Sequence, residues 1–210
     1  MAPSWIEKFI VRVDATPDPK RSQETPSLEM HYTALEGHRR VVGVKGDSKP
    51  RYEVTRESIL QLWGDKCIVT SLVNGNSEIA AIDFHSFPPS TEVEFLQRQH
   101  IITVKMSEER YTASGGLGDL HWKPTGMVPY GKASWEVRDE TDLVMSVTTD
   151  DHQVNGVIRL WRDGLGPETV EELIVMGLSK LEEYRRMMRL SRRSAVQSGS
   201  IAPWLAPAIQ

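Results

Sequence analysis

Short runs of alternating apolar and polar residues occupy the chain between residues 28 and 161, and they limit its possible folds more than any other feature. In one run, Ala80, Ile82 and Phe84 share a face, as residues two apart do on a strand. Turn residues separate the runs, as in Asn74-Gly75-Asn76, which suits a tight hairpin. The pattern predicts strands at 28–34, 38–45, 50–55, 58–63, 66–73, 78–85, 91–96, 100–106, 109–113, 119–123, 132–138, 142–148 and 155–161. We expect an antiparallel barrel or sandwich.

The pattern changes at Gly164-Leu165-Gly166-Pro167, where a helix is expected to begin, because proline fits the first helical turn. Apolar residues then recur at spacings of three and four. Acidic residues come first and basic residues last, which complements the helix dipole. We predict a helix over 167–190. Around Leu173–Leu178 the apolar surface runs nearly all the way round, so we expect the sheet to enclose this helix.

The predicted domain covers residues 28–193, with additional segments at both ends. Residues 5–13 resemble a further strand, and the proline-rich stretch 14–27 is expected to be a surface loop. Residues 1–27 are therefore an N-terminal strand and loop. The polar and then proline-broken stretch 194–210 is expected to be a disordered tail.

Composition argues against several classes of protein. A net charge of −4 gives no overall attraction to nucleic acid. A single cysteine, Cys67, excludes an internal disulfide framework and a cysteine-based zinc site. No run of about 18 apolar residues predicts a transmembrane helix, and the N-terminus does not resemble a secretory signal. We expect no metal and no cofactor, and a location in the cytoplasm or nucleus or at the periphery of a membrane.

Three side chains are candidate acid–base groups. Asp83 and His85 are two apart and share a strand face, as a carboxylate–histidine dyad would require. His121 lies beside Trp122, which we expect to be in the core. Catalysis would need these groups to face inward. The interpretation we favour places all three on the polar outer surface of a β-structure.

A basic cluster in and beyond the helix suggests a ligand-binding surface. Near an anionic membrane each basic residue contributes about 1 kcal/mol. The competing interpretation is a solvated helix end that complements the dipole. The candidate ligand-binding residues are Lys180, Arg185, Arg186 and Arg189.

Several segments resemble an uncharacterised β-rich domain family that is abundant in mushroom-forming fungi. Glu78–His85 is similar to its "E-V-A-x-I-x-W-H" strand, and 110–123 is similar to its "R-x-F-T-a-x-D-G-x-x-Y-K-W-K" segment. The likeness covers roughly residues 50–193, although Ser114–Gly118 replaces a compact Asp-Gly turn. That family is in turn similar in layout to the tubby-like, LURP-one and phospholipid-scramblase group. The resemblance implies a closed antiparallel barrel of about twelve strands around one hydrophobic C-terminal helix. It implies no catalytic residues.

Two functional hypotheses follow from these features. The first is a non-enzymatic binding module for anionic lipid headgroups or a membrane-proximal partner. The alternative is a carrier of a small apolar ligand, or an isomerase- or cyclase-type accessory enzyme of fungal specialised metabolism. The second needs space inside the barrel, whereas the first needs an accessible basic surface.

Overall fold

The computed structural model describes residues 16–35, 39–58, 65–127 and 131–197. Within them lie twelve strands, a one-turn helix and a long C-terminal helix. The strands are β1 (Leu28–Ala34), β2 (Arg39–Val44), β3 (Tyr52–Ser58), β4 (Asp65–Ser71), β5 (Ser77–Ser86), β6 (Pro89–Phe95), β7 (His100–Lys105), β8 (Arg110–Ala113), β9 (Gly118–Met127), β10 (Ala133–Arg138), β11 (Leu143–Thr149) and β12 (Gly156–Leu160). The helices are α2 (Lys20–Gln23) and α3 (Pro167–Gln197).

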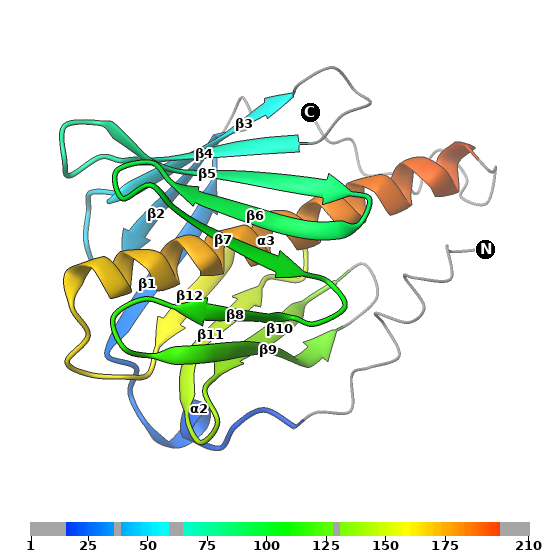
Figure 1. Cartoon of the computed structure of the whole chain (residues 1–210). Coiled ribbons are helices and arrows are strands. Elements are labelled where there is room, and N and C mark those ends of the chain that lie inside the picture. Colours follow the sequence, from blue (N-terminus) through cyan, green and yellow to red (C-terminus); the bar gives the residue numbers. More distant parts are fainter. Residues whose placement is uncertain (1–15, 36–38, 59–64, 128–130, 198–210) are drawn as a thin grey trace.

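All twelve strands belong to one antiparallel sheet in the order β7-β6-β5-β4-β3-β2-β1-β12-β11-β10-β9-β8. Hairpins connect most neighbours, and the pairing of β1 with β12 joins the two ends of the strand region. The outermost strands, β7 and β8, lie next to each other, so the sheet curls into a nearly closed barrel (Figure 1). The predicted mainly-β antiparallel barrel is therefore confirmed.

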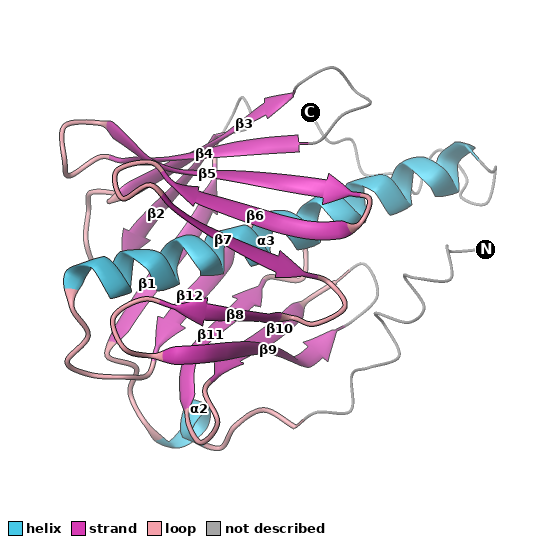
Figure 2. Ribbon diagram, in the orientation of Figure 1, coloured by secondary structure: helices cyan, strands magenta, loops and turns pink. Residues whose placement is uncertain are grey.

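Helix α3 passes between the two halves of the curled sheet (Figure 2). Every residue from Glu172 to Tyr184 is buried, which confirms that this helix packs within the curve of the sheet. One contact is an edge-on pair between Trp135 of β10 and Tyr184, with ring centroids 5.2 Å apart. Burying a large apolar side chain of this kind contributes about 1.5–3 kcal/mol, so the helix and barrel stabilise each other.

Some element boundaries differ from expectation. Helix α3 continues past the predicted end at 190 to Gln197, because no proline or glycine interrupts it before Gly199. The first part of the stretch 194–210, expected to be disordered, is therefore helical. The predicted strand 5–13 lies outside the described residues, as does 58–63 except for Ser58, where β3 ends.

The proline-rich stretch before β1 lies along the outside of the barrel, and residues 16–27 are called the strap below. It contains the unpredicted one-turn helix α2, which crosses the outer face of β9, β10 and β11. The strap reaches β1 through Ser27, whose N–H donates to the carbonyl oxygen of Leu160 at 2.9 Å. This path brings the strap to the surface that carries two candidate sites.

Candidate functional site

The predicted acid–base pair on β5 faces away from the barrel interior. Ile82 and Phe84 are buried in the core, and the alternation of the strand turns Asp83 and His85 to the outside. His85 is exposed, and Asp83 is half-buried in the ladder position between Lys66 and Glu92. The two side chains therefore lie on the outer polar surface, away from the core.

Lys180 points into the barrel. Its ammonium is 2.9 Å from a Glu183 carboxylate oxygen and 3.4 Å from one of Glu109, and it lies 5.5 Å from the ring centre of Trp122. Burial lowers the pKa of Lys180, but the charges of Glu183 and Glu109 outweigh burial, and the pKa is raised overall. Lys180 is thus a paired internal charge and is not presented to an external ligand.

Arg185 is also directed at buried groups. Its guanidinium donates to the hydroxyl oxygen of Tyr32 at 2.7 Å, and Tyr32 donates to the Glu182 carboxylate. Arg186 and Arg189 are half-exposed, as is Arg185, but Arg186 donates to the hydroxyl of exposed Ser86 at 2.9 Å. The four predicted basic residues therefore do not form one outward surface, because a helix in a barrel turns part of its circumference toward each wall.

A different group of basic side chains meets on the outer face of β8 and β9. Strand register places Arg110 of β8 opposite His121 of β9, and His121 opposite Arg138 of β10. Lys123 lies two residues beyond His121 on the same face. We call Arg110, His121 and Lys123 the cationic patch. They line a surface depression of about 360 Å³ together with Ser107, Glu108, Glu109, Trp122 and Pro124.

The cationic patch keeps uncompensated positive charge. Within the described part of the chain neither Arg110 nor Lys123 forms an ion pair. The acidic residues beside the patch are engaged elsewhere. Glu108 pairs with Lys105 at 3.0 Å and Glu109 pairs with Lys180, while Glu136, opposite Lys123 in the ladder, pairs with Arg21 and Arg138. The sequence analysis found His121 but missed the patch, because only strand register brings Arg110 beside it.

The pKa of His121 reflects this surrounding charge. Burial lowers the pKa first, and the charges of Arg110, Arg138 and Lys123 lower it further, against a weaker opposing effect of Asp139. The imidazole is half-buried and is therefore held neutral more readily than an ordinary histidine. A bound anion would reverse this balance and favour the protonated ring.

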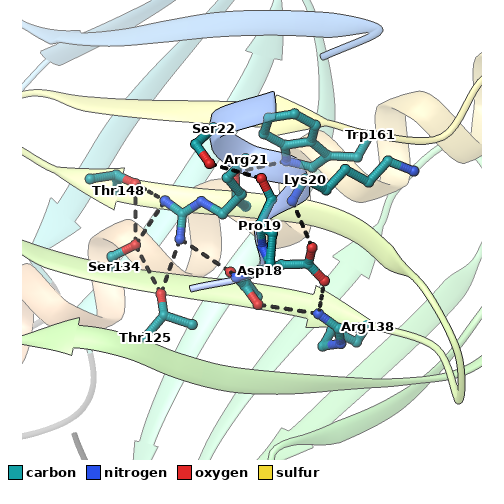
Figure 3. A network of polar contacts seen from close by, with 12 residues as sticks. Asp18, Pro19, Lys20, Arg21, Ser22, Thr125, Ser134, Arg138, Thr148 and Trp161 are labelled. Atoms are coloured by element: carbon teal, nitrogen blue, oxygen red, sulfur yellow. Dashed lines mark hydrogen bonds and ion pairs between the residues drawn. The ribbon is translucent and has the colours of Figure 1, made fainter. Parts of the chain in front are cut away.

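A second polar site lies where the strap crosses β9, β10 and β11 (Figure 3). The guanidinium of Arg21 donates to the hydroxyl oxygens of Thr125 at 3.1 Å, Ser134 at 3.0 Å and Thr148 at 3.1 Å. It also lies 3.3 Å from a carboxylate oxygen of Glu136. We call these four acceptor residues the arginine socket.

Asp18 provides the second contact of the strap. Its N–H donates to the Glu136 carboxylate at 2.8 Å, and its own carboxylate accepts a hydrogen bond from Arg138. The hydrogen bond from Arg138 is the main reason that the pKa of Asp18 is lowered. Glu136 is 0 % exposed, so the strap and Arg138 together neutralise a carboxylate that is shielded from water.

The barrel interior contains charged side chains of α3, and each has a partner. Glu172 accepts the N–H of Ser114 at 2.8 Å, and Glu183 accepts the hydroxyl of Thr91 at 3.0 Å. Such pairing is what buried polar groups require in a stable core. A small apolar ligand inside the barrel would have to displace part of α3 and these contacts.

Two kinds of feature are absent from the described ranges. No group of three or more histidine, cysteine, aspartate or glutamate side chains there could hold a metal ion. None of the helices described there has the length and apolar character to cross a bilayer.

Comparison with protein families and with curated proteins finds no match. The fold has a likeness to the X-ray structure of a protein from Arabidopsis thaliana, at 12% sequence identity and a TM-score of 0.48. The alignment covers 75% of this chain and 91% of that chain. At this identity and TM-score the likeness carries no argument about function. The resemblance to the fungal family and the tubby-like group gains no support from these comparisons.

Proposed function

We propose that the chain is a non-enzymatic binding module that holds a phosphate-bearing ligand on the cationic patch. The observation that carries this proposal is the convergence of Arg110, His121 and Lys123 on one outer face without neutralising partners in the described ranges. Phosphate groups favour clustered basic side chains, because charge-assisted hydrogen bonds to them are short and strong.

The location of the cationic patch supports a ligand that approaches from outside. The depression is shallow and open, and its floor is the edge of the barrel at β8 and β9. Anionic lipid headgroups carry phosphate and can reach the patch from outside, since a membrane presents its phosphates to an outer surface. Such binding would place the protein at the periphery of a membrane. We also propose that residues 50–193 are related to the fungal family and, through it, to the tubby-like layout.

The half-exposed Arg186 and Arg189 form a competing surface, because the sequence analysis named them as candidate ligand residues. Arg186 already donates to Ser86 and lies over the Phe84 ring, 5.9 Å from its centre. An anion there would compete with these contacts. The cationic patch has no comparable internal partner for Arg110 or Lys123 among the described residues, which is why we prefer it.

The test is co-sedimentation with phosphatidylcholine vesicles that contain phosphatidylserine, against vesicles of phosphatidylcholine alone. We expect salt-sensitive binding to the anionic vesicles only. The double variant Arg110→Ala/Lys123→Ala should bind roughly thirtyfold more weakly, from about 1 kcal/mol for each basic residue. The matched control, Arg186→Ala/Arg189→Ala, removes two charges elsewhere and should bind like the parent.

A second arm distinguishes lipid headgroups from free phosphate compounds. Calorimetric titration with inorganic phosphate should give no heat if the ligand is a membrane-bound headgroup, and saturable heat if free phosphate suffices. Loss of vesicle binding in the Arg186→Ala/Arg189→Ala variant would move the site to α3. Failure of the parent protein to bind either probe would overturn the proposal.

A further inference from the structure

The strap is held against the barrel almost entirely by polar contacts. None of the side chains from 16 to 27 is fully buried, so the hydrophobic effect contributes little to its docking. Its attachment depends on Arg21 and Asp18, whose ion pairs with Glu136 and Arg138 are largely shielded from water. Because none of the strap's side chains is part of the hydrophobic core, the segment can leave its surface without opening the core, provided that another cation takes the place of Arg21 beside Glu136.

The arginine socket, in contrast, is part of the rigid barrel. Ser134 and Thr148 are opposite each other in the ladder of β10 and β11, and a β-bulge in β9 places Thr125 beside Ser134. The hydroxyl of Thr125 donates to that of Ser134 at 3.1 Å. Ser134, Thr125 and Glu136 are all buried with the strap in place, and the pairing of β9, β10 and β11 holds their backbone in position.

The chemistry of the socket selects a guanidinium group. Three hydroxyl oxygens and one carboxylate oxygen accept from a single planar cation, whose forked N–H groups match several acceptors at once. An ammonium group has fewer donors and no planar fork, so it would leave part of the socket unsatisfied. Arg138 lies beside Glu136 and donates to the carboxylate of Asp18. This contact explains why the strap carries an acidic residue together with Arg21.

We propose that the arginine socket is a binding site for an exposed arginine of a partner protein, with an acidic residue three positions before it, and that Arg21 and Asp18 of the strap occupy this site in the free chain. The strap then acts as an internal competitor for the partner segment. The proposed ligand has the opposite charge to that of the cationic patch, although the two sites are neighbours on one outer face, where Lys123 is opposite Glu136 in the ladder of β9 and β10.

The test uses a fluorescent peptide with the sequence of residues 16–27 and measures its anisotropy with full-length protein. The receptor is the Arg21→Ala variant, whose socket is vacant, after circular dichroism has shown it to be folded. We expect saturable binding to this variant and binding about tenfold weaker or worse to the parent chain, whose own strap competes. A peptide in which glutamine replaces the arginine should also bind about tenfold more weakly or worse, because it lacks charge-assisted hydrogen bonds.

A second variant and a control keep the outcome clear. If Arg21→Ala does not fold, Asp18→Ala replaces it as the receptor. This substitution loosens the strap and leaves the acceptor groups of the arginine socket unchanged. Adding Ser134→Ala to either receptor should weaken peptide binding, whereas adding Thr103→Ala on distant β7 should not. Equal binding of the arginine and glutamine peptides, or no binding to a folded receptor, would overturn the proposal.

Discussion

Gly177 of α3 lies so close to Ile158 of β12 that a β-carbon at position 177 would be 2.9 Å from Cδ1 of Ile158. A glycine inside a helix costs about 1 kcal/mol relative to alanine, so its presence needs a packing reason. The close approach of the helix to the barrel wall provides that reason. It also shows how tightly α3 fits within the barrel.

Alanine at position 177 should therefore destabilise the protein. We expect Gly177→Ala to lower the free energy of unfolding by about 1–2 kcal/mol, because overpacking exceeds the gain in helix propensity. Urea denaturation measures this. Ile158→Val, which removes Cδ1, should recover part of the loss in the double variant. Gly166→Ala is the control, since a β-carbon at position 166 would have no neighbouring atom within 4 Å. A stabilised Gly177→Ala variant would contradict the close contact.

Removal of the buried charge of Lys180 should be costly. Lys180→Met leaves the carboxylates of Glu183 and Glu109 without their shared cation, and breaking a buried pair in this way costs about 3 kcal/mol. Thermal and urea unfolding should both reveal the loss. Lys105→Met is the matched control, because Lys105 and Glu108 are exposed and their pair contributes less than about 1 kcal/mol. Equal effects of the two substitutions would show that Lys180 is not an internal ion pair.

Glu29 should make stability depend on acid pH. Burial raises its pKa, but hydrogen bonds from Arg159, His31 and Lys45 outweigh burial and bring the pKa to about 2 in the folded protein, below the ordinary 4.5. A depressed pKa stabilises the fold above about pH 4.5, and this stabilisation is lost as the pH falls from there toward 2.

Glu29→Gln should therefore reduce the free energy of unfolding by about 1–3 kcal/mol at neutral pH, and the difference from the parent should shrink as the pH approaches 2. Denaturation across this pH range measures both curves. His85→Gln serves as a control on the outer surface. A difference that stays constant down to the lowest pH would mean that Glu29 is not held ionised by its neighbours.

Ligand binding on the cationic patch should strengthen in mild acid. The pKa of His121 is lowered by burial and by its cationic neighbours, and a bound anion would raise it, so binding and protonation should be coupled. We expect vesicle affinity to increase several-fold between about pH 7.5 and about pH 5.5, either side of the ordinary histidine pKa.

The substitution His121→Gln tests this coupling. It should bind like the neutral parent and should remove most of the pH dependence, while Arg110→Ala should weaken binding at every pH. His85→Gln, which changes a histidine on a different strand, should leave the pH profile unchanged. A profile that is identical for the parent and His121→Gln would exclude His121 from the site.

The local sequence pattern was sufficient to predict most strands of the barrel. Ten of the twelve described strands lie within two residues of their predicted ranges. Strand β9 continues to Met127, four residues past its predicted end at 123, and β3 merges the run at 50–55 with the start of the next. Each strand depends on alternation within a few residues, and α3 on Pro167 and an apolar spacing of three and four. These are properties of neighbours in the chain, so the sequence reports them directly.

The arginine socket and the internal ion pairs depended on distant contacts that local pattern does not contain. Arg21 and Glu136 are 115 residues apart, and Lys180 and Glu109 are 71 apart. Alternation restricts which face a residue takes but does not choose its partner across a ladder. The basic residues of α3 illustrate this limit, because rotation of the helix within the barrel turned Lys180 inward.

By itself, then, the sequence determined the order and kind of the elements and the enclosure of an apolar helix by a sheet, because those follow from side-chain periodicity and burial of apolar surface. Only the tertiary structure decided which charges are internal and which meet outside. Strand register brings Arg110 beside His121, and the docked strap sets Arg21 into Ser134 and its neighbours. The first follows from the register of the β8–β9 hairpin, and the second from a contact between segments that are 113 residues apart in the chain.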